Sequence, residues 1–265
     1  MNRYQFKLFF SYLSYLIYRP HREGHGIHSP FLFDYMTSVL NNRSISPQLK
    51  EVLNLRQQLL KDISILQVED LGAGARNHRN HERRVKNIIR YSSTVPKYAK
   101  LLHHTVAHFQ PKSILELGTC LGLGTAYLAT ACPTAKVITV EGSNHLFQRS
   151  RENFDLLKIN NIFPVNGNFQ DILPQIVKEE KGFDMVFMDG NHRKEATLNY
   201  FETLLPCMNS NSMVILDDIR WSEEMFEAWQ KITEYKQVRL SLDLFQLGIV
   251  FFNEKLQKQH FQIYY

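Results

Sequence analysis

The sequence predicts an α/β protein whose main domain holds a mostly parallel sheet of seven strands. From Pro111 onward, short apolar runs alternate with segments of helical periodicity, which is typical of consecutive β–α–β units. The last two apolar runs are only a few residues apart, so they predict an antiparallel hairpin at one edge of the sheet. A chain of 265 residues that is 44% hydrophobic is long enough to bury a core of this size.

The first ninety residues predict helices. Ser29-Pro30 and Ser46-Pro47 each place an N-cap serine before a proline at the first helical position. After the second pair, apolar residues recur at helical spacing and predict one buried face: Leu49, Val52, Leu53, Leu60 and Ile63. We therefore expect a helical extension or lid over residues 1–90 and the main domain over residues 91–265.

The segment "MNRYQFKLFFSYLSYLIYRPH" at the start of the sequence predicts an aromatic helix that packs on the protein's own body. Its apolar part, Leu8 to Tyr18, is too short to span a bilayer and is interrupted by serines and tyrosines. No small-residue cleavage site follows it. We expect no transmembrane segment and a cytoplasmic location, with peripheral membrane contact as the less favoured alternative.

Three widely spaced cysteines argue against a disulfide framework and fit a reducing compartment.

The predicted strands of the main domain follow one another with helical segments between most of them. They are 113–117, 136–141, 162–165, 183–188, 213–217, 237–242 and 246–252. Seven strands that end in a hairpin differ from the six parallel strands of a dinucleotide-binding domain.

Two glycine-rich stretches compete for the role of a cofactor loop: "VEDLGAGARNHRNHERR" from Val68 and "SILELGTCLGLGTAYLA" from Ser113. A cofactor loop needs a following helix and then a strand that ends in an acid for the ribose hydroxyls. A helix, the strand "KVITV" and Glu141 follow Gly118, whereas only a basic run follows Gly72. We therefore predict that the second stretch binds the cofactor. The stretch from Val68 is expected to be a tight turn or hairpin. We expect its basic residues to border the cleft on the side where the second substrate, the acceptor, binds.

The second loop reads Glu116-x-Gly118-x-x-x-Gly122-x-Gly124 and resembles motif I of the class I S-adenosylmethionine-dependent methyltransferases. "VITVEGS", "VNGNFQDILPQI", "FDMVFMDGNH" and "MVILDDIRW" resemble, in order, later segments of the catechol-type O-methyltransferases. The resemblance covers roughly residues 92–252, and the "HGIHSPF" loop resembles uncharacterised bacterial relatives. Two departures are Asp218, where the family usually has asparagine, and His192, where it often has lysine.

This resemblance implies a Rossmann-like fold and S-adenosylmethionine as the cofactor. It places Glu141 at the ribose, and Asn168, Phe169 and Gln170 around the adenine. The full predicted cofactor set is Glu116, Gly118, Thr119, Gly122, Gly124, Glu141, Gly142, Asn168, Phe169, Gln170 and Asp189.

Three acids fall at the carboxyl ends of neighbouring strands, where open α/β sheets bind ligands: Asp189, Asp217 and Asp218. Unpaired carboxylates so close together would repel one another, so a divalent cation such as Mg²⁺ is the predicted occupant. The alternative is that Asp217 or Asp218 caps the following helix or pairs with Arg193 or Arg220.

His192 is the predicted catalytic base, because it follows Asp189 by three residues in the loop that leaves the strand. Methyl transfer is an in-line displacement that depends on alignment, and a hydroxyl nucleophile must also lose its proton. Asp189 is the other predicted catalytic residue and the base if no metal binds. The alternative for His192 is an ordinary surface histidine.

O-methylation of a small-molecule hydroxyl is the function that the sequence favours, and a homodimer is compatible with it. A nucleic acid methyltransferase remains the alternative because five arginines and Lys86 stand against Glu82 between Arg76 and Arg90. That stretch interleaves no aromatic residue before Tyr91, so nucleic acid is the less favoured partner and a solvated face is preferred. A non-catalytic binding protein of the same fold is a third reading.

His21, His25 and His28 lie close together in the sequence, but no nearby carboxylate or cysteine completes a set of zinc ligands. No zinc site is therefore predicted there.

Overall fold

The computed structural model describes residues 3–18, 21, 27–69 and 82–265. Its helices are α1 (Arg3–Tyr18), α2 (Pro30–Tyr35), a π-helical turn (Met36–Leu40), α3 (Pro47–Leu59), α4 (Val85–Tyr91), α5 (Pro96–Phe109), α6 (Leu123–Ala131), α7 (Asn144–Leu156), α8 (Phe169–Glu179), α9 (Lys194–Leu204), a 3-10 turn (Leu205–Cys207) and α10 (Glu223–Glu234). Its strands are β1 (Ile65–Gln67), β2 (Glu82–Arg84), β3 (Ser113–Leu117), β4 (Lys136–Glu141), β5 (Ile162–Asn166), β6 (Met185–Met188), β7 (Met213–Leu216), β8 (Leu240–Asp243), β9 (Gly248–Phe251) and β10 (Gln259–Gln262).

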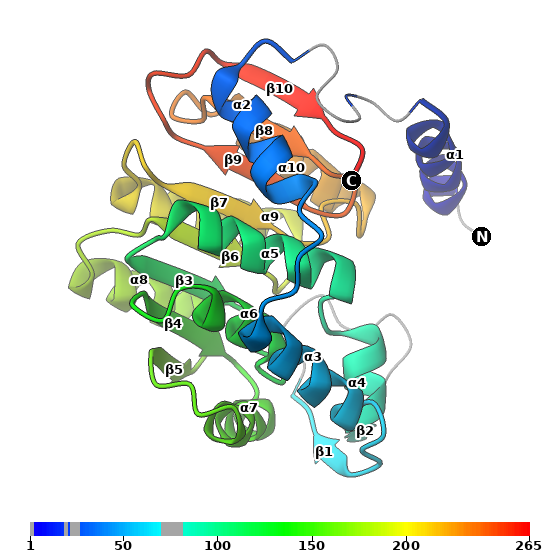
Figure 1. Ribbon diagram of the computed structural model, residues 1–265, viewed down its shortest axis with the longest axis vertical. Coiled ribbons are helices and arrows are strands. Elements are labelled where there is room, and N and C mark those ends of the chain that lie inside the picture. Colours follow the sequence, from blue (N-terminus) through cyan, green and yellow to red (C-terminus); the bar gives the residue numbers. More distant parts are fainter. Residues whose placement is uncertain (1–2, 19–20, 22–26, 70–81) are drawn as a thin grey trace.

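The central sheet has eight strands in the order β10-β8-β9-β7-β6-β3-β4-β5, which confirms the predicted fold class (Figure 1). Strand β9 pairs antiparallel with both β7 and β8, and the other neighbouring pairs are parallel. The predicted number of seven strands was wrong, because β10 adds an eighth beyond the hairpin. This short strand is polar and half-exposed, so no apolar run marks it in the sequence. The hairpin therefore lies one strand inside the edge.

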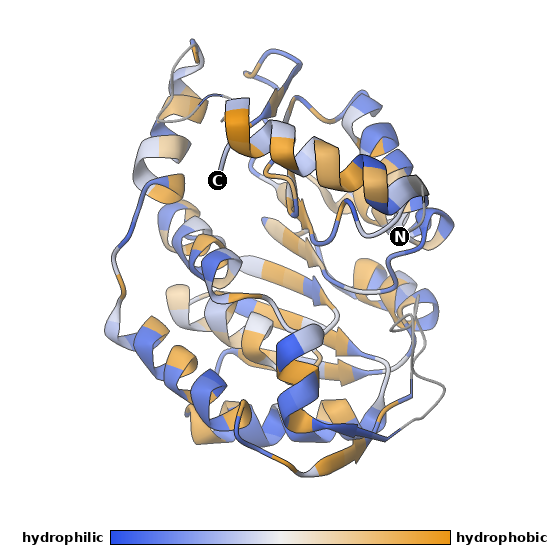
Figure 2. Ribbon diagram, turned by 90° about the vertical axis from the view of Figure 1, so that its right-hand side faces the viewer, coloured by the Kyte–Doolittle hydropathy of each residue, from blue (hydrophilic) through white to orange (hydrophobic). Residues whose placement is uncertain are grey.

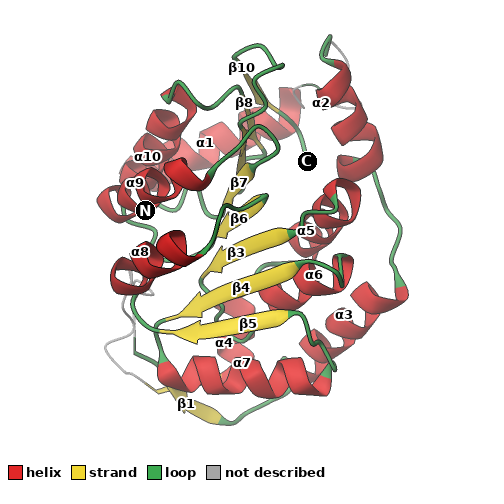
Figure 3. Cartoon of the chain, turned by 90° about the vertical axis from the view of Figure 1, so that its left-hand side faces the viewer, coloured by secondary structure: helices red, strands yellow, loops and turns green. Residues whose placement is uncertain are grey.

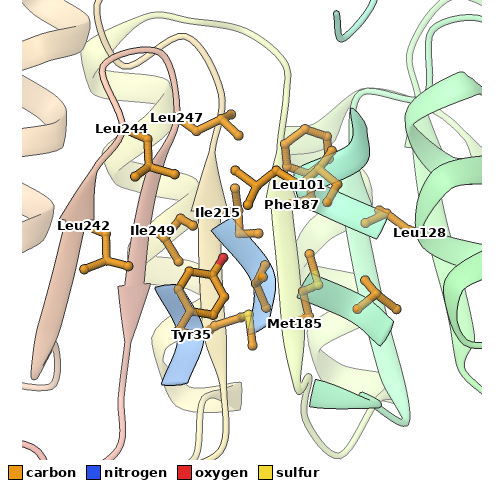
Figure 4. Packing of buried hydrophobic residues seen from close by; sticks show 14 of the residues in the cluster. Tyr35, Leu101, Leu128, Met185, Phe187, Ile215, Leu242, Leu244, Leu247 and Ile249 are labelled. Atoms are coloured by element: carbon orange, nitrogen blue, oxygen red, sulfur yellow. The ribbon is translucent and has the colours of Figure 1, made fainter. Parts of the chain in front are cut away.

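Helices cover both faces of the sheet, and successive strand residues alternate between them (Figure 3). On one face, α2, the π-helical turn, α5 and α6 pack on residues such as Met185, Phe187 and Ile215 (Figure 4). On the other face, α8, α9 and α10 pack on Val186, Met188 and their neighbours. This two-sided burial explains why the inner strands are almost continuously apolar in sequence.

The two predicted serine caps are confirmed in the N-terminal part. Ser29 accepts a hydrogen bond from Leu32 N, and Ser46 accepts one from Leu49 N. The predicted buried face of α3 was partly wrong, because Ile63 lies beyond the end of the helix and is exposed. The chain turns there because the Asp62 carboxylate accepts a hydrogen bond from Ser64 N, a local alternative to another helical turn.

The flanks of the first glycine-rich stretch form a small antiparallel hairpin. Strand β1 pairs with β2, with Ile65 opposite Arg84. A hairpin at this place agrees with the prediction, although Gly72 and Gly74 lie outside the described residues. Helices α3 and α4 next to it share a separate apolar cluster with α6. The boundary between residues 90 and 91 stays a prediction.

Helix α1 packs on the body of the protein, as predicted. Tyr15 Oη donates a hydrogen bond to the carbonyl oxygen of Ile263, and Tyr265 N donates one to Tyr15 Oη. The rings of Tyr12 and Tyr15 also contact Phe245 in the β8–β9 turn. Across the described ranges, every helix is too short or too polar to cross a membrane.

Candidate active site

A half-open cavity of about 1240 Å³ lies at the carboxyl ends of β3, β4, β6 and β7. This is the edge where open α/β sheets bind ligands, because the loops that leave parallel strands gather there. The β1–β2 hairpin and α4 form the opposite wall. The cavity therefore lies between the sheet edge and the N-terminal part of the chain.

Gly118 begins the predicted cofactor loop in a conformation that only glycine adopts easily, with φ at +111°. A Cβ atom at this position would lie 2.0 Å from the carbonyl oxygen of Asp189. The loop thus lies directly against the end of β6, and Gly118 lines the cavity. Gly122 instead packs on Phe154, and a Cβ at Gly124 would lie 2.8 Å from Glu116 Oε1.

Glu116 lies behind this loop and is fully buried, so it is not among the residues that line the cavity. Its Oε2 accepts hydrogen bonds from the hydroxyls of Thr125 and Thr139, while no described residue pairs with Oε1. Burial raises the pKa of Glu116 to about 7, against the opposing effect of the two hydroxyl donors. In this arrangement Glu116 supports the loop from inside.

Glu141 lines the cavity at the end of β4, where the sequence predicts the ribose site. Its Oε2 accepts a hydrogen bond from Cys120 N and its Oε1 accepts one from Ser143 N, both 2.8 Å long. Burial raises its pKa, and these backbone hydrogen bonds act in the opposite direction. Because each carboxylate oxygen has two lone pairs, Glu141 retains acceptor capacity for two hydroxyl groups.

The predicted adenine segment lies at the start of α8. Asn168 caps the helix by accepting a hydrogen bond from Gln170 N. The Phe169 ring lies so close to Gly190 that a Cβ there would be 2.6 Å from it, and it makes an edge contact with Tyr200. Asn168 and Phe169 line the cavity, whereas Gln170 does not.

The three predicted acids all line the cavity. Burial and the neighbouring acids Asp217 and Asp218 raise the pKa of Asp189 well above its usual range. Burial, followed by Asp218, raises the pKa of Asp217 to about 7. Asp217 accepts hydrogen bonds from Gln246 Nε2 and from Asp218 N. Neighbouring acids thus raise the pKa of Asp189 and of Asp217, because like charges close together disfavour the ionised form.

The alternative roles considered for Asp217 and Asp218 are wrong in two respects. Ser222 caps α10, because its hydroxyl accepts a hydrogen bond from Met225 N. Arg220 forms its ion pair with Asp243 and not with either of the two acids.

The predicted magnesium site is not supported by the donor arrangement. Within residues 3–18, 21, 27–69 and 82–265, no group of three or more His, Cys, Asp or Glu side chains is placed to hold a metal ion. The three acids come together at one cavity without forming a ligand set.

His192 lies in the cavity wall, with Nε2 3.9 Å from Asp189 Oδ1 and its ring 5.9 Å from that of Trp221. Burial lowers its pKa, and the nearby Asp218 acts in the opposite direction. A lowered pKa favours the neutral imidazole, the form that is able to accept a proton. The side chain is 18% exposed, so both the catalytic role of His192 and the surface alternative stay predictions.

The N-terminal wall of the cavity contributes a basic rim. Arg83, Arg84 and Arg90 line it, and Arg84 and Arg90 are exposed to solvent. Arg76 and Arg79 lie outside the described residues. The rim gives the cavity a cationic side that faces the acidic strand ends.

The structure places some of the predicted site residues in the wall of the cavity and the others outside that wall. Gly118, Glu141, Gly142, Asn168, Phe169, Asp189, His192, Asp217 and Asp218 line the cavity. Glu116, Thr119, Gly122, Gly124 and Gln170 do not. The sequence analysis missed further lining residues, among them Cys120, Ser143, Tyr200, Trp221 and Gln246. Three of them carried a signal, since Cys120 lies in the "SILELGTCLGLGTAYLA" loop, Ser143 ends "VITVEGS" and Trp221 ends "MVILDDIRW".

Comparison with known proteins gives a consistent result. Residues 115–219 match the model of a methyltransferase domain. A catechol O-methyltransferase of Niastella koreensis is 32% identical over 130 residues, which are 48% of this chain and 58% of the relative. The match therefore spans less than two thirds of that curated relative.

Two solved structures share the fold. The SAH-bound methyltransferase PaMTH1 of Podospora anserina has a TM-score of 0.60 at 17% identity, covering 80% of this chain and 91% of the other. An O-methyltransferase of Bacillus cereus in complex with SAH has a TM-score of 0.56 at 20% identity, covering 83% and 97%. At these identities the likeness concerns the fold, and it agrees with the mostly parallel sheet covered by helices that is described above.

Proposed function

We propose that this chain, whose residues 115–219 form a methyltransferase domain, transfers a methyl group from S-adenosylmethionine to a hydroxyl oxygen of a small molecule. The observation that carries the proposal is the placement of Glu141, Gly118 and Asp189 around one cavity at the carboxyl ends of the strands. An acceptor for two hydroxyls, a close-approach glycine and an acid beside it suit a ligand with a ribose and a positive end. These residues therefore fit the cofactor, which supplies the methyl group when it is bound.

In this proposal Glu141 binds the ribose hydroxyls, and Phe169 offers an apolar face to the adenine. Asp189 lines the same cavity as Glu141 and provides an acid for the positively charged end of the cofactor. Gly142 and Asn168 line the same part of the cavity and are proposed as further cofactor contacts. Glu116, Thr119, Gly122, Gly124 and Gln170 are proposed to shape the loops around the cofactor, because none of them lines the cavity.

His192 is proposed as the base that accepts the proton of the acceptor hydroxyl. It lies in the cavity wall beside Asp189 and Trp221, and its lowered pKa favours the neutral form. Asp189 is the alternative base, and burial and its neighbouring acids raise its pKa well above the usual range. The remaining contribution is alignment of the acceptor oxygen with the methyl group. No step of this proposal requires a metal ion.

The basic rim supports a second candidate, methylation of a nucleic acid. Arg83, Arg84 and Arg90 lie at the wall of the cavity, where a phosphate backbone would contact them. Binding to tRNA that weakens steeply with salt, together with methyl transfer to it, would favour this candidate over a small-molecule acceptor.

The direct test combines binding and turnover. Calorimetry with S-adenosylmethionine should give one site per chain, and methyl transfer should be measured against a panel of phenols, sugar hydroxyls and tRNA. Cofactor binding with transfer to a small hydroxyl would support the proposal. Absence of cofactor binding would contradict it and favour the non-catalytic reading.

A further inference from the structure

Helix α1 buries one face against the rest of the protein. Tyr4 Oη donates a hydrogen bond to the carbonyl oxygen of Arg220, and Tyr12 and Tyr15 contact the Phe245 ring. Lys7 lies 3.7 Å from Glu223 at the start of α10. These contacts fix the helix beside the β8–β9 turn and the segment after β7, two segments that also form part of the cavity wall.

The opposite face of α1 is apolar and exposed. Phe6, Phe10 and Ile17 are 56%, 51% and 74% exposed, and their spacing places them along one side of the helix. Phe9 is 50% exposed and lies next to them, and the rings of Phe6 and Phe10 are 4.7 Å apart. Figure 2 shows α1 in front of the body of the protein, with hydrophobic residues along its outer surface. A contiguous aromatic stripe of this kind marks an interaction surface.

The charge of this segment indicates what the stripe contacts. The first 22 residues contain four basic residues, Arg3, Lys7, Arg19 and Arg22, and no acidic residue. The remaining 243 residues share a net charge of only +1, because the whole chain carries +5. An apolar helix face within a basic segment is the composition of helices that lie in the interface of an anionic bilayer.

We propose that α1 binds the surface of an anionic lipid bilayer, with Phe6, Phe9, Phe10 and Ile17 inserted among the headgroups. The helix has 16 residues and is about 24 Å long, so it lies along the interface and does not cross it. A second copy of the chain is the weaker occupant. The charge of the segment is of one sign, and two such helices brought together would repel each other.

The test uses the full-length chain and large unilamellar vesicles, one set of phosphatidylcholine alone and one with phosphatidylglycerol. The protein should sediment with the anionic vesicles, less with the neutral ones, and less at 1 M salt, where charges are screened. The combined variant Phe6→Ser, Phe10→Ser, Ile17→Ser should lower the bilayer partition coefficient at least about tenfold, because three apolar anchors are lost.

A matched control replaces three residues of comparable exposure far from α1: Ile63→Ser, Leu156→Ser and Phe163→Ser. This variant should sediment like the parent. Circular dichroism and cofactor affinity should be unchanged in both variants, because none of the six side chains lines the cavity. Vesicle binding needs neither cofactor nor acceptor, so it succeeds or fails independently of the proposed activity.

Two results would overturn the inference. One is a parent protein that stays in the supernatant with anionic vesicles. The other is an α1 variant that sediments as well as the parent. A parent dimer that this variant converts into monomers, without vesicle binding, would assign the stripe to a second copy of the chain.

Discussion

Arg220 forms a two-pronged ion pair with Asp243, in which NH1 and NH2 donate to Oδ1 and Oδ2 over 2.6 and 2.5 Å. The guanidinium also donates to the carbonyl oxygen of Phe245 and lies between the rings of Phe226 and Phe245. The pair thereby connects the segment after β7 to the β8–β9 turn, whose Gln246 reaches Asp217. Both segments contribute residues to the cavity wall.

The first prediction concerns this pair. Arg220→Leu leaves the Asp243 carboxylate buried without its partner and should lower the free energy of unfolding by roughly 3–5 kcal/mol. Chemical denaturation measures the loss. The double variant Arg220→Met, Asp243→Leu should recover most of it, because no unpaired charge remains. A single variant as stable as the parent would show that the pair contributes little.

Glu141→Gln should weaken S-adenosylmethionine binding at least about tenfold in calorimetry, because hydrogen bonds to a charged acceptor contribute roughly 1.5–3 kcal/mol. Glu179→Gln on the exposed side of α8 is the matched control and should bind like the parent. Equal affinity of the Glu141 variant and the parent would remove Glu141 from the cofactor site.

Glu116 predicts a pH dependence of stability. Its pKa is about 7 in the folded protein and 4.5 as a free side chain, so the folded state holds the proton more tightly. The contribution of Glu116 to the free energy of unfolding is therefore fully present below pH 4.5. It falls as the pH rises to about 7, and it does not change further at higher pH. The decline amounts to about 3 kcal/mol. Glu116→Gln should lack this component, so the difference between variant and parent should grow in the variant's favour between pH 4.5 and 7. A difference that does not change with pH would show that Glu116 is ionised throughout.

His192→Ala should reduce turnover most at neutral pH and less at alkaline pH, where the acceptor hydroxyl ionises without help. A loss of about a hundredfold at neutral pH is the scale expected of a general base. Affinity for S-adenosylmethionine should stay within about twofold of the parent, since Glu141 carries the ribose contact. A uniform loss at every pH would indicate a positioning role for His192.

A strong chelator should leave activity unchanged, because the described side chains include no group of three or more His, Cys, Asp or Glu placed to hold a metal ion. The same assay with added magnesium serves as the comparison. Loss of activity with the chelator and recovery with magnesium would show that the acids rearrange around a metal, and Asp218→Asn would then retain activity.

Much of the fold could be predicted from local pattern. The run at residues 113–117 and the run at residues 136–141 became strands with the predicted bounds. Ser29 and Ser46 became caps, because an N-cap serine before proline is a local signal. Strand β10 escaped prediction because it is short, polar and half-exposed, so no apolar run marks it in the sequence.

The site was harder to predict, because the sequence places residues at a strand end without saying which way their side chains point. Glu116 and Glu141 both occur at strand ends, yet only Glu141 lines the cavity. Likewise, the repulsion expected among the three acids is relieved by the raised pKa values of Asp189 and Asp217. Burial decides both outcomes, and burial depends on the whole fold.

The hydrogen bonds of Tyr15 to Ile263 and Tyr265 have a consequence for the making of the protein. The partners are about 250 positions apart, so the ribosome releases α1 long before the residues that hold it. Through most of synthesis both aromatic faces of the helix are uncovered, because Arg220, Phe245 and Ile263, which hold it, are all translated late. Helix α1 is therefore a segment that we expect chaperones to bind during synthesis.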